Sequence, residues 1–229
     1  LDYLVSDMHA KSVTAILELE KSKISTSSII KVLSAGLLGL RANRKLVPTR
    51  WSITAVDDTL SKNKLKSIKS YQEISEILLF TSEYLGNHYE FLLLPANFSF
   101  EVIEINSKNH NAWQDYETFS GRKDYAKSVT GAYYSNRLAL TEYLEKIKRQ
   151  ATCIVFREIN KEYTQSMGVG ILRQISRDAF LKQPEKFSTL IEALSRIQSR
   201  IKLPLSVFME KSKLLQDYGK QKKITEWFN

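Results

Sequence analysis

The chain is poor in the residues that support disulfide and metal chemistry. Its 229 residues include one cysteine, Cys153, and three histidines that lie far apart in the sequence. One cysteine excludes a disulfide within the chain and a cysteine-rich zinc site. Cys153 stands in the apolar run "CIVF", which is typical of a packed small side chain rather than a nucleophile. We therefore expect no metal and no cofactor within this chain.

Long apolar runs are also absent. No stretch of the sequence is long enough to cross a bilayer, and we recognise no signal peptide in it. The first residue is Leu1 rather than methionine, so we expect the protein's N-terminus to be missing. A hydrophobic share of 43% and a charged share of 26% are typical of a soluble globular protein. We expect no membrane among its partners.

Acidic residues are missing from one long span. No aspartate or glutamate occurs between Lys21 and Val56, and the whole chain has a net charge of +9. Such a charge favours an anionic partner, which could be nucleic acid, an anionic membrane or an acidic protein surface. Four basic residues surround a proline-containing connection in this span and are our candidates for contacts with DNA phosphates: Arg41, Arg44, Lys45 and Arg50. The alternative is a solvated basic rim.

Aromatic residues beside arginines allow two interpretations. Trp51 follows Arg50 and could stack on an unpaired base, but its residue type favours the first core position of a strand. Tyr133 and Tyr134 precede Arg137, which could bind an anion, although such tyrosines more often lie at the edge of a core.

The apolar pattern predicts several helices. Helical spacing occurs over residues 8–20, 129–150, 170–182, 186–201 and 204–217. Ser25–Ser28 provides cap residues for a further apolar helix that Gly39 helps to end, and Pro48 forbids a helix through the connection that follows.

Strands are predicted between these helices. "WSITAV" (51–56) reads as a strand that leads into a polar loop to about Ser70. Two apolar stretches around Gly86-Asn87 predict a β-hairpin, and "TCIVFREI" a buried strand. "FSFEVIEI" fits a helix or a strand, and residues 106–127 read as an irregular surface segment. We expect an α+β fold with a small mixed sheet, several packed helices, a helical C-terminal part and a flexible tail. The expected domains are a core at 1–218 and a peptide at 219–229.

Three carboxylates raise the possibility of an enzyme. Asp57 and Asp58 follow the predicted strand 51–56, and Glu158 lies near the end of "CIVFREI". Metal-dependent nucleases need several converging carboxylates, so a nuclease or another DNA-processing enzyme is our alternative function. Helix or turn capping by one aspartate, and a salt bridge of Glu158 with an arginine such as Arg157 or Arg173, are the more common roles, and no catalytic residue is assigned.

The C-terminal residues "QKKITEWFN" carry a spaced motif. Gln221, Ile224, Trp227 and Phe228 resemble the peptide with which DNA replication and repair proteins bind the sliding clamp (PCNA). One turn of 3₁₀-helix would bring Ile224 and Trp227 to the same side. The first aromatic in such peptides is usually Phe or Tyr, and here it is Trp227. The alternative is a tail that folds back on its own domain.

Three longer segments resemble a known family. "SAGLLGLRANRKLVPTRWSITAVDD" (34–58), "SVTGAYYSNRLALTEYLEKIKRQATCIVFREINKEY" (128–163) and "GVGILRQISRDAF" (168–180) are similar to segments of the archaeal Nre family of DNA repair proteins, in the same order. The resemblance implies an archaeal, cytoplasmic protein of the DNA damage response that ends in a clamp-binding peptide. It also implies an N-terminal four-cysteine, zinc-binding region that this chain lacks, so the chain resembles the C-terminal domain of a longer protein. It implies no catalytic mechanism.

Overall fold

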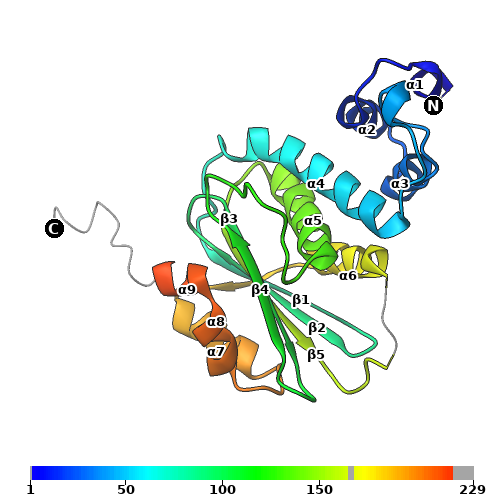
Figure 1. Cartoon of the computed structure of the whole chain (residues 1–229). Helices are drawn as coiled ribbons and strands as arrows, with labels where there is room; N and C mark the ends of the chain where they lie inside the picture. Colours follow the sequence, from blue (N-terminus) through cyan, green and yellow to red (C-terminus); the bar gives the residue numbers. More distant parts are fainter. Residues whose placement is uncertain (1, 165–167, 219–229) are drawn as a thin grey trace.

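A six-stranded mixed sheet forms the centre of the protein (Figure 1). The computed structural model describes residues 2–164 and 168–218. The strands lie in the order β4-β3-β5-β2-β1-β6, and within the described residues β3 and β5 form the parallel pair. Their bounds are β1 Ile77–Tyr84, β2 Asn87–Leu94, β3 Ser99–Asn106, β4 Ala112–Glu117, β5 Thr152–Ile159 and β6 Glu185–Phe187. The predicted α+β class is confirmed.

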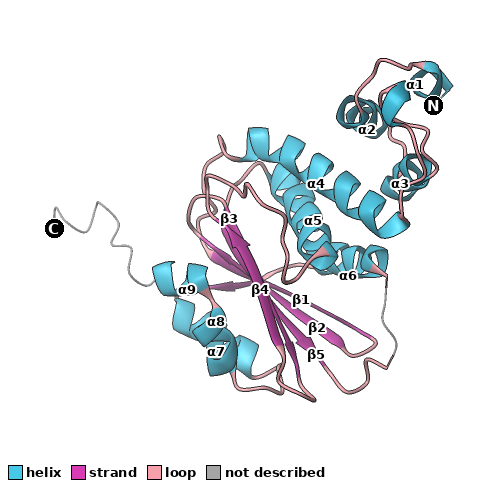
Figure 2. Ribbon diagram, viewed as in Figure 1, coloured by secondary structure: helices cyan, strands magenta, loops and turns pink. Residues whose placement is uncertain are grey.

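Helices cover both faces of this sheet (Figures 1 and 2). Helices α4, α5 and α6 cover one face, α7–α9 cover the other, and α2 and α3 pack against α4. The helices are α1 Asp2–Ser6, α2 Ser12–Lys21, α3 Thr26–Ser34, α4 Thr49–Ile68, α5 Gly131–Ile147, α6 Val169–Leu181, α7 Leu190–Gln198, α8 Leu205–Lys211 and α9 Lys213–Tyr218. A 3₁₀ turn spans Arg41–Asn43. No described helix is long and apolar enough to cross a membrane.

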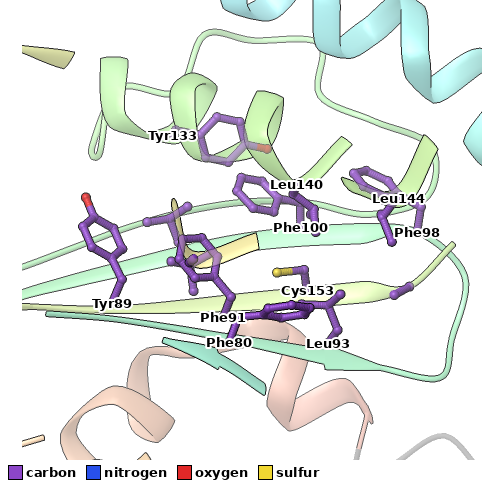
Figure 3. Packing of buried hydrophobic residues seen from close by; sticks show 14 of the residues in the cluster. Phe80, Tyr89, Phe91, Leu93, Phe98, Phe100, Tyr133, Leu140, Leu144 and Cys153 are labelled. Carbon is purple, nitrogen blue, oxygen red and sulfur yellow. The ribbon is translucent and has the colours of Figure 1, made fainter. Parts of the chain in front are cut away.

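The central strands are apolar on both faces because both faces are covered. Successive side chains of a strand point to opposite sides, so Phe91 and Val155 pack under α5 and α6 whereas Leu92 and Ile154 pack under α7 and α8. Figure 3 shows the first of these clusters around Phe91 and Cys153. Cys153 is fully buried, as its apolar surroundings predicted.

The predicted hairpin is confirmed, with its turn one residue earlier than expected. Leu85 and Gly86 connect β1 to β2, and both have positive φ, 45° and 78°. Positive φ at both central residues is the geometry of a two-residue hairpin turn. Asn87 therefore begins β2, where its side chain is buried.

The strand predicted at 51–56 and the loop predicted at 57–70 are wrong, because Thr49–Ile68 is one continuous helix, α4. Local β-propensity misled us at "WSITAV". Val56 and Leu60 lie one turn apart and are buried against α2 and α3, while Leu65 and Ile68 are buried against the sheet cluster. Burial of this helical stripe outweighs the weak preference of six residues for a strand.

Most other elements agree with the sequence. Helix α5, strand β5 and helix α6 lie where they were predicted, and "FSFEVIEI" is a strand, β3. Residues 106–127 are not irregular throughout, since 112–117 form the edge strand β4. The helix predicted at 204–217 is divided, because the residue between α8 and α9, Ser212, is extended.

Candidate nucleic-acid interface

One side of α4 carries a row of polar and aromatic side chains. Trp51, Asp58, Lys62 and Lys66 follow at intervals of seven, four and four residues, and Lys69 comes three residues later at the C-cap. Such intervals place side chains on one face of a helix. Lys66 is exposed, Lys62 pairs with the Asp58 carboxylate at 2.8 Å, and Lys69 donates to a backbone carbonyl of the β4–α5 loop. The row is therefore basic along most of its length.

The loop between β4 and α5 faces this row and is held in place by one arginine. The Arg122 guanidinium donates to the carbonyls of Tyr116 and Tyr125 at 2.8 and 3.2 Å and pairs with Asp115 at 3.0 Å. The Asp115 carboxylate also accepts from the backbone N–H groups of residues 128 and 129. These bonds fix the loop and keep the positive charge of Arg122 beside α4.

A buried arginine forms the floor between α4 and the loop. Arg137 of α5 is 1% exposed. Its Nη1 donates to both oxygens of Glu117 at 3.0 Å, its Nη2 pairs with Asp58, and its Nε donates to Ser61 at 3.1 Å. Burial alone would lower the pKa of Arg137, but the Glu117 and Asp58 carboxylates outweigh burial and raise that pKa. Arg137 is therefore a charged connector between α4, α5 and β4.

Two adjoining cavities of about 250 and 190 Å³ lie above this floor and share Lys62, Arg122 and Arg137. Together they are lined by six basic and three acidic side chains. Two of the acids, Glu117 and Asp58, already pair with Arg137. The basic members of the two linings are Lys62, Lys66, Lys69, Arg122, Lys123 and Arg137. The cleft therefore suits an anionic group.

Aromatic rings continue from the smaller cavity to the surface. Tyr134 lies in its wall and stacks with Tyr125 at 5.2 Å between ring centroids, and Tyr125 lies 6.1 Å from Trp51. The guanidinium of Arg50 lies over the Trp51 ring at 5.8 Å. Trp51 is 49% exposed, so the prediction that it is the first core residue of a strand is wrong. Its place on the outer face of a helix leaves its ring accessible.

The four basic residues predicted from the acid-free span divide into two groups. Arg41, Lys45 and Arg50 are exposed. The Arg44 guanidinium instead donates to carbonyls of Gly39, Val5 and Asp7 at 2.8, 2.6 and 2.6 Å. Arg44 therefore ties the connection between α3 and α4 to the N-terminal residues.

The three carboxylates of the predicted nuclease site do not come together, which removes the observation behind that alternative. Asp57 is buried and accepts two bonds from Arg173 of α6 at 2.7 and 2.9 Å. Glu158 lies under the opposite helical layer, where it accepts from the backbone N–H groups of Lys202 and Leu203 at 2.6–3.1 Å. Each carboxylate thus has an ion-pair or capping role. Among the described residues, no group of three or more His, Cys, Asp or Glu side chains could hold a metal ion.

Burial raises the pKa of the Asp57 carboxyl to about 6, against the opposing effect of Arg173. Burial likewise raises the pKa of Tyr133, which lies between the rings of Phe100 and Tyr134. Tyr133 and Tyr134 thus belong to the core, the more common of the two roles considered from the sequence.

Sequence reasoning missed the row on α4, Arg122 and the pair between Arg137 and Glu117. The intervals from Asp58 to Lys69 were a usable signal, because they fit a helix face, but they were hidden by the loop assigned to residues 57–70. Arg122 and Glu117 carried no local signal. The predicted clamp peptide, Gln221–Phe228, lies outside the described residues.

Both halves of the chain match models of a known protein family. Residues 1–114 match the family described as "Archaeal Nre, N-terminal", and residues 117–227 match "Archaeal Nre, C-terminal". The chain thus matches both parts of the family and not its C-terminal part alone.

Three curated relatives carry related names. The chain is 38% identical over 229 residues to "DNA repair protein NreB" of Archaeoglobus fulgidus, which covers 96% of this chain and 58% of the relative. It is 36% identical over 199 residues to "DNA repair protein NreA" of the same organism, with 83% and 50% covered. It is 32% identical over 192 residues to "DNA repair protein NreA" of Haloferax volcanii, with 79% and 46% covered. The chain spans about half the length of these relatives. No solved structure matches.

Proposed function

Because this chain belongs to the archaeal Nre family, we propose that it acts in DNA repair, contacts DNA through a basic surface and binds the sliding clamp through its C-terminal peptide. The names of the curated relatives support the repair role. The DNA contact rests on the exposed basic row of α4, and the clamp contact rests on the spacing of the last residues.

The observation that carries the DNA contact is the exposed basic side of α4. Lys62 and Lys66 follow along the helix beyond Arg50 and Trp51, so exposed positive charges extend over several turns. Helix geometry puts Trp51 and Lys69 about 27 Å apart, at 1.5 Å per residue. A surface of this length can meet several phosphates, and each contact releases counterions.

The connection that precedes α4 extends the same basic surface. Arg41, Lys45 and Arg50 are exposed in a span that contains no acid, so no carboxylate within that span neutralises them. We expect these three side chains to contact phosphates. Arg44 is expected to act through the conformation of the connection, because its guanidinium is held by backbone carbonyls.

Salt-dependent binding tests the DNA contact. Changing Arg41, Lys45 and Arg50 together to Ala should weaken binding of a labelled oligonucleotide in fluorescence anisotropy and reduce the log–log salt slope by about 3 units. A matched control changes three exposed lysines on the opposite helical layer to Ala, with the same loss of charge: Lys202, Lys211 and Lys213. Equal slopes for the two triple variants would remove this surface from the proposal.

The clamp contact is supported by the chemistry of the last residues. Ile224, Trp227 and Phe228 are apolar, and burying side chains of this size contributes about 1.5–3 kcal/mol each. Gln221 can both donate and accept a hydrogen bond beside them. Lys220, Lys222 and Lys223 suit an acidic partner surface. A tether of this kind raises the effective concentration of a weak DNA-binding surface beside the duplex that the clamp encircles.

Binding to an archaeal sliding clamp tests the tail directly. Trp227→Ala or Phe228→Ala should weaken clamp affinity in calorimetry by about tenfold or more. Lys222→Ala is the control and should cost much less, with an effect that fades at high salt. Unchanged affinity after deletion of residues 221–229 would refute the clamp contact. A large loss of thermal stability in Trp227→Ala would instead show that the tail packs on its own domain.

A further inference from the structure

The cleft beside α4 combines two features that a purely electrostatic DNA contact does not need. It has a basic part, lined by Lys62, Lys66, Lys69 and Arg122, and an aromatic part, lined by Tyr125 and Tyr134. Phosphates require the first feature alone. The second feature provides flat apolar surface, which suits a nucleobase.

The sizes of the two cavities fit the parts of one nucleotide. Their volumes of about 250 and 190 Å³ are far above the ~30 Å³ share of one water molecule. Each is smaller than the ~300 Å³ at which sites for whole drug-sized ligands begin. Each cavity therefore suits one group of a larger ligand, with a phosphate in the basic part and a ring in the aromatic part.

The rings of Trp51 and Tyr125 do not form a parallel stack with one another. Their centroids lie 6.1 Å apart, and their planes are tilted by 48°. Both rings are partly exposed, at 49% and 37%. Arg50 lies over Trp51 and adds a positive charge at the same point, which favours an anionic nucleotide over an apolar peptide.

The floor of the cleft is built to keep this geometry. Arg137 uses its guanidinium on Glu117, Asp58 and Ser61, so it is occupied by protein groups and holds α4, β4 and α5 together. The Asp58 carboxylate is half-buried in the smaller cavity, and each oxygen of a carboxylate can accept a second hydrogen bond. It therefore offers an acceptor to a base edge.

We propose that this cleft binds one unpaired nucleotide of a DNA strand, with its base against Trp51 and Tyr125 and its phosphates on Lys62, Lys66 and Lys123. The proposal rests on the proposed DNA contact and adds a preference to it. Bases within a duplex are covered by their neighbours in the stack, so the aromatic rings can reach only a base that is unpaired or flipped out. The cleft would thus select single-stranded or locally opened DNA.

Three oligonucleotides of equal length separate stacking from charge. A single strand offers phosphates and free bases, a strand of abasic residues offers phosphates alone, and a blunt duplex offers phosphates with covered bases. We expect the full-length chain to bind the single strand about 5- to 100-fold more tightly than the abasic strand, the range that one stacked base contributes. The duplex should behave like the abasic strand or bind more weakly.

Two substitutions then test the aromatic part and the basic part of the cleft separately. Trp51→Ala should bring the ratio of single-strand to abasic affinity close to one and leave abasic binding unchanged, while Trp51→Phe should retain part of the ratio. Lys66→Ala should weaken both strands equally, keep the ratio and lower the salt slope by about one unit. Tyr84→Ala, at an exposed ring on the β1–β2 hairpin, is the matched control and should change none of these values.

The outcomes separate this inference from the proposed function. Equal affinity for the single strand and the abasic strand, with both still weakened by Lys66→Ala, would overturn the nucleotide site and leave the DNA contact intact. A ratio that survives both Trp51→Ala and Tyr125→Leu would also overturn the site. Failure of all three oligonucleotides to bind would refute the DNA contact and the nucleotide site together. Thermal melting of each variant checks that the fold is retained.

Discussion

The two helical layers of this protein bury charge in different ways. Under α4–α6 buried arginines pair with carboxylates: Arg137 pairs with Glu117 and Asp58, and Arg173 pairs with Asp57. Under α7–α9 the sheet carboxylate Glu90 pairs with His88 and Arg200, and two others accept hydrogen bonds from backbone N–H groups. The first arrangement joins side chains of three elements and leaves a cleft beside them, whereas the second ties a helical layer to the sheet.

Two carboxylates of the second layer, Glu101 and Glu158, bind backbone N–H groups of the helical layer. Glu101 of β3 accepts from the Ser212 hydroxyl and from the backbone N–H groups of Lys213 and Leu214, at the first residues of α9. Glu158 of β5 accepts from two N–H groups just before α8. A negative charge is favourable at such unsatisfied N–H groups. The comparison indicates that the α7–α9 layer is structural, and that a ligand is to be sought beside α4.

The largest effect expected from this comparison is a loss of stability when the floor of the cleft is broken. Arg137→Met leaves Glu117 buried without its partner, which should lower the free energy of unfolding by about 3–5 kcal/mol. Urea unfolding measures this change. The double variant Arg137→Met, Glu117→Gln removes both charges and should recover part of it. A loss below about 1 kcal/mol would show that water enters the cleft and replaces the arginine.

A substitution under the α7–α9 layer should lower stability and leave DNA affinity unchanged. Glu158→Ala leaves two backbone N–H groups without an acceptor, which should cost about 2–6 kcal/mol, since each such group costs ~1–3 kcal/mol. DNA affinity, measured below the melting temperature of the variant, should not change. The contrast between the two layers would fail if Glu158→Ala weakened DNA binding as much as loss of the basic residues does.

A smaller, pH-dependent effect on stability is expected from Asp57. Burial raises the folded-state pKa of Asp57 from 3.8 to about 6, so its contribution to stability is present below pH 3.8 and is lost as pH rises through 6. The melting temperature of the wild type should therefore fall relative to Asp57→Asn between pH 4 and pH 7. The opposite trend would show that Arg173 outweighs burial and holds the pKa below its usual value.

The smallest change expected is at a single exposed lysine of the cleft. Lys66→Ala removes an exposed charge that makes no ion pair within the described part of the chain, so the melting temperature should stay within about 1 °C, as is usual for surface substitutions. Its effect should instead be seen in the salt dependence of DNA binding. A clear loss of stability would show that Lys66 has a structural role, which would weaken the functional contrast between the layers.

The elements that the sequence predicted well are those with a strong local signal. The hairpin has a turn sequence between two apolar runs, and α5 and β5 have clean helical and strand patterns. Helix α4 was misread because its first residues prefer a strand and its later ones are polar. Its helical form depends on burial against α2, α3 and α5, which lie before and long after it in the chain.

The candidate site was predictable only in part. The acid-free span led to Arg50 and Trp51, which do lie at an exposed surface. The partners of that surface come from β4 and α5, dozens of residues later, and no local pattern connects Glu117 with Arg137 or either residue with Asp58. Which carboxylate neutralises which arginine depends on distances of a few ångströms that arise only when the helical layer packs.

By itself the sequence determined the α+β class, the excess of positive charge, the absence of a cysteine-based site and the spacing of the C-terminal peptide, because each follows from composition or from residues close together in the chain. Only the tertiary structure decided that Asp57 and Asp58 pair with different arginines, that Glu158 binds backbone N–H groups of the far layer and that Trp51 is half-exposed beside a basic cleft. These outcomes depend on burial and on contacts between distant segments, and both arise when the two helical layers pack on the sheet.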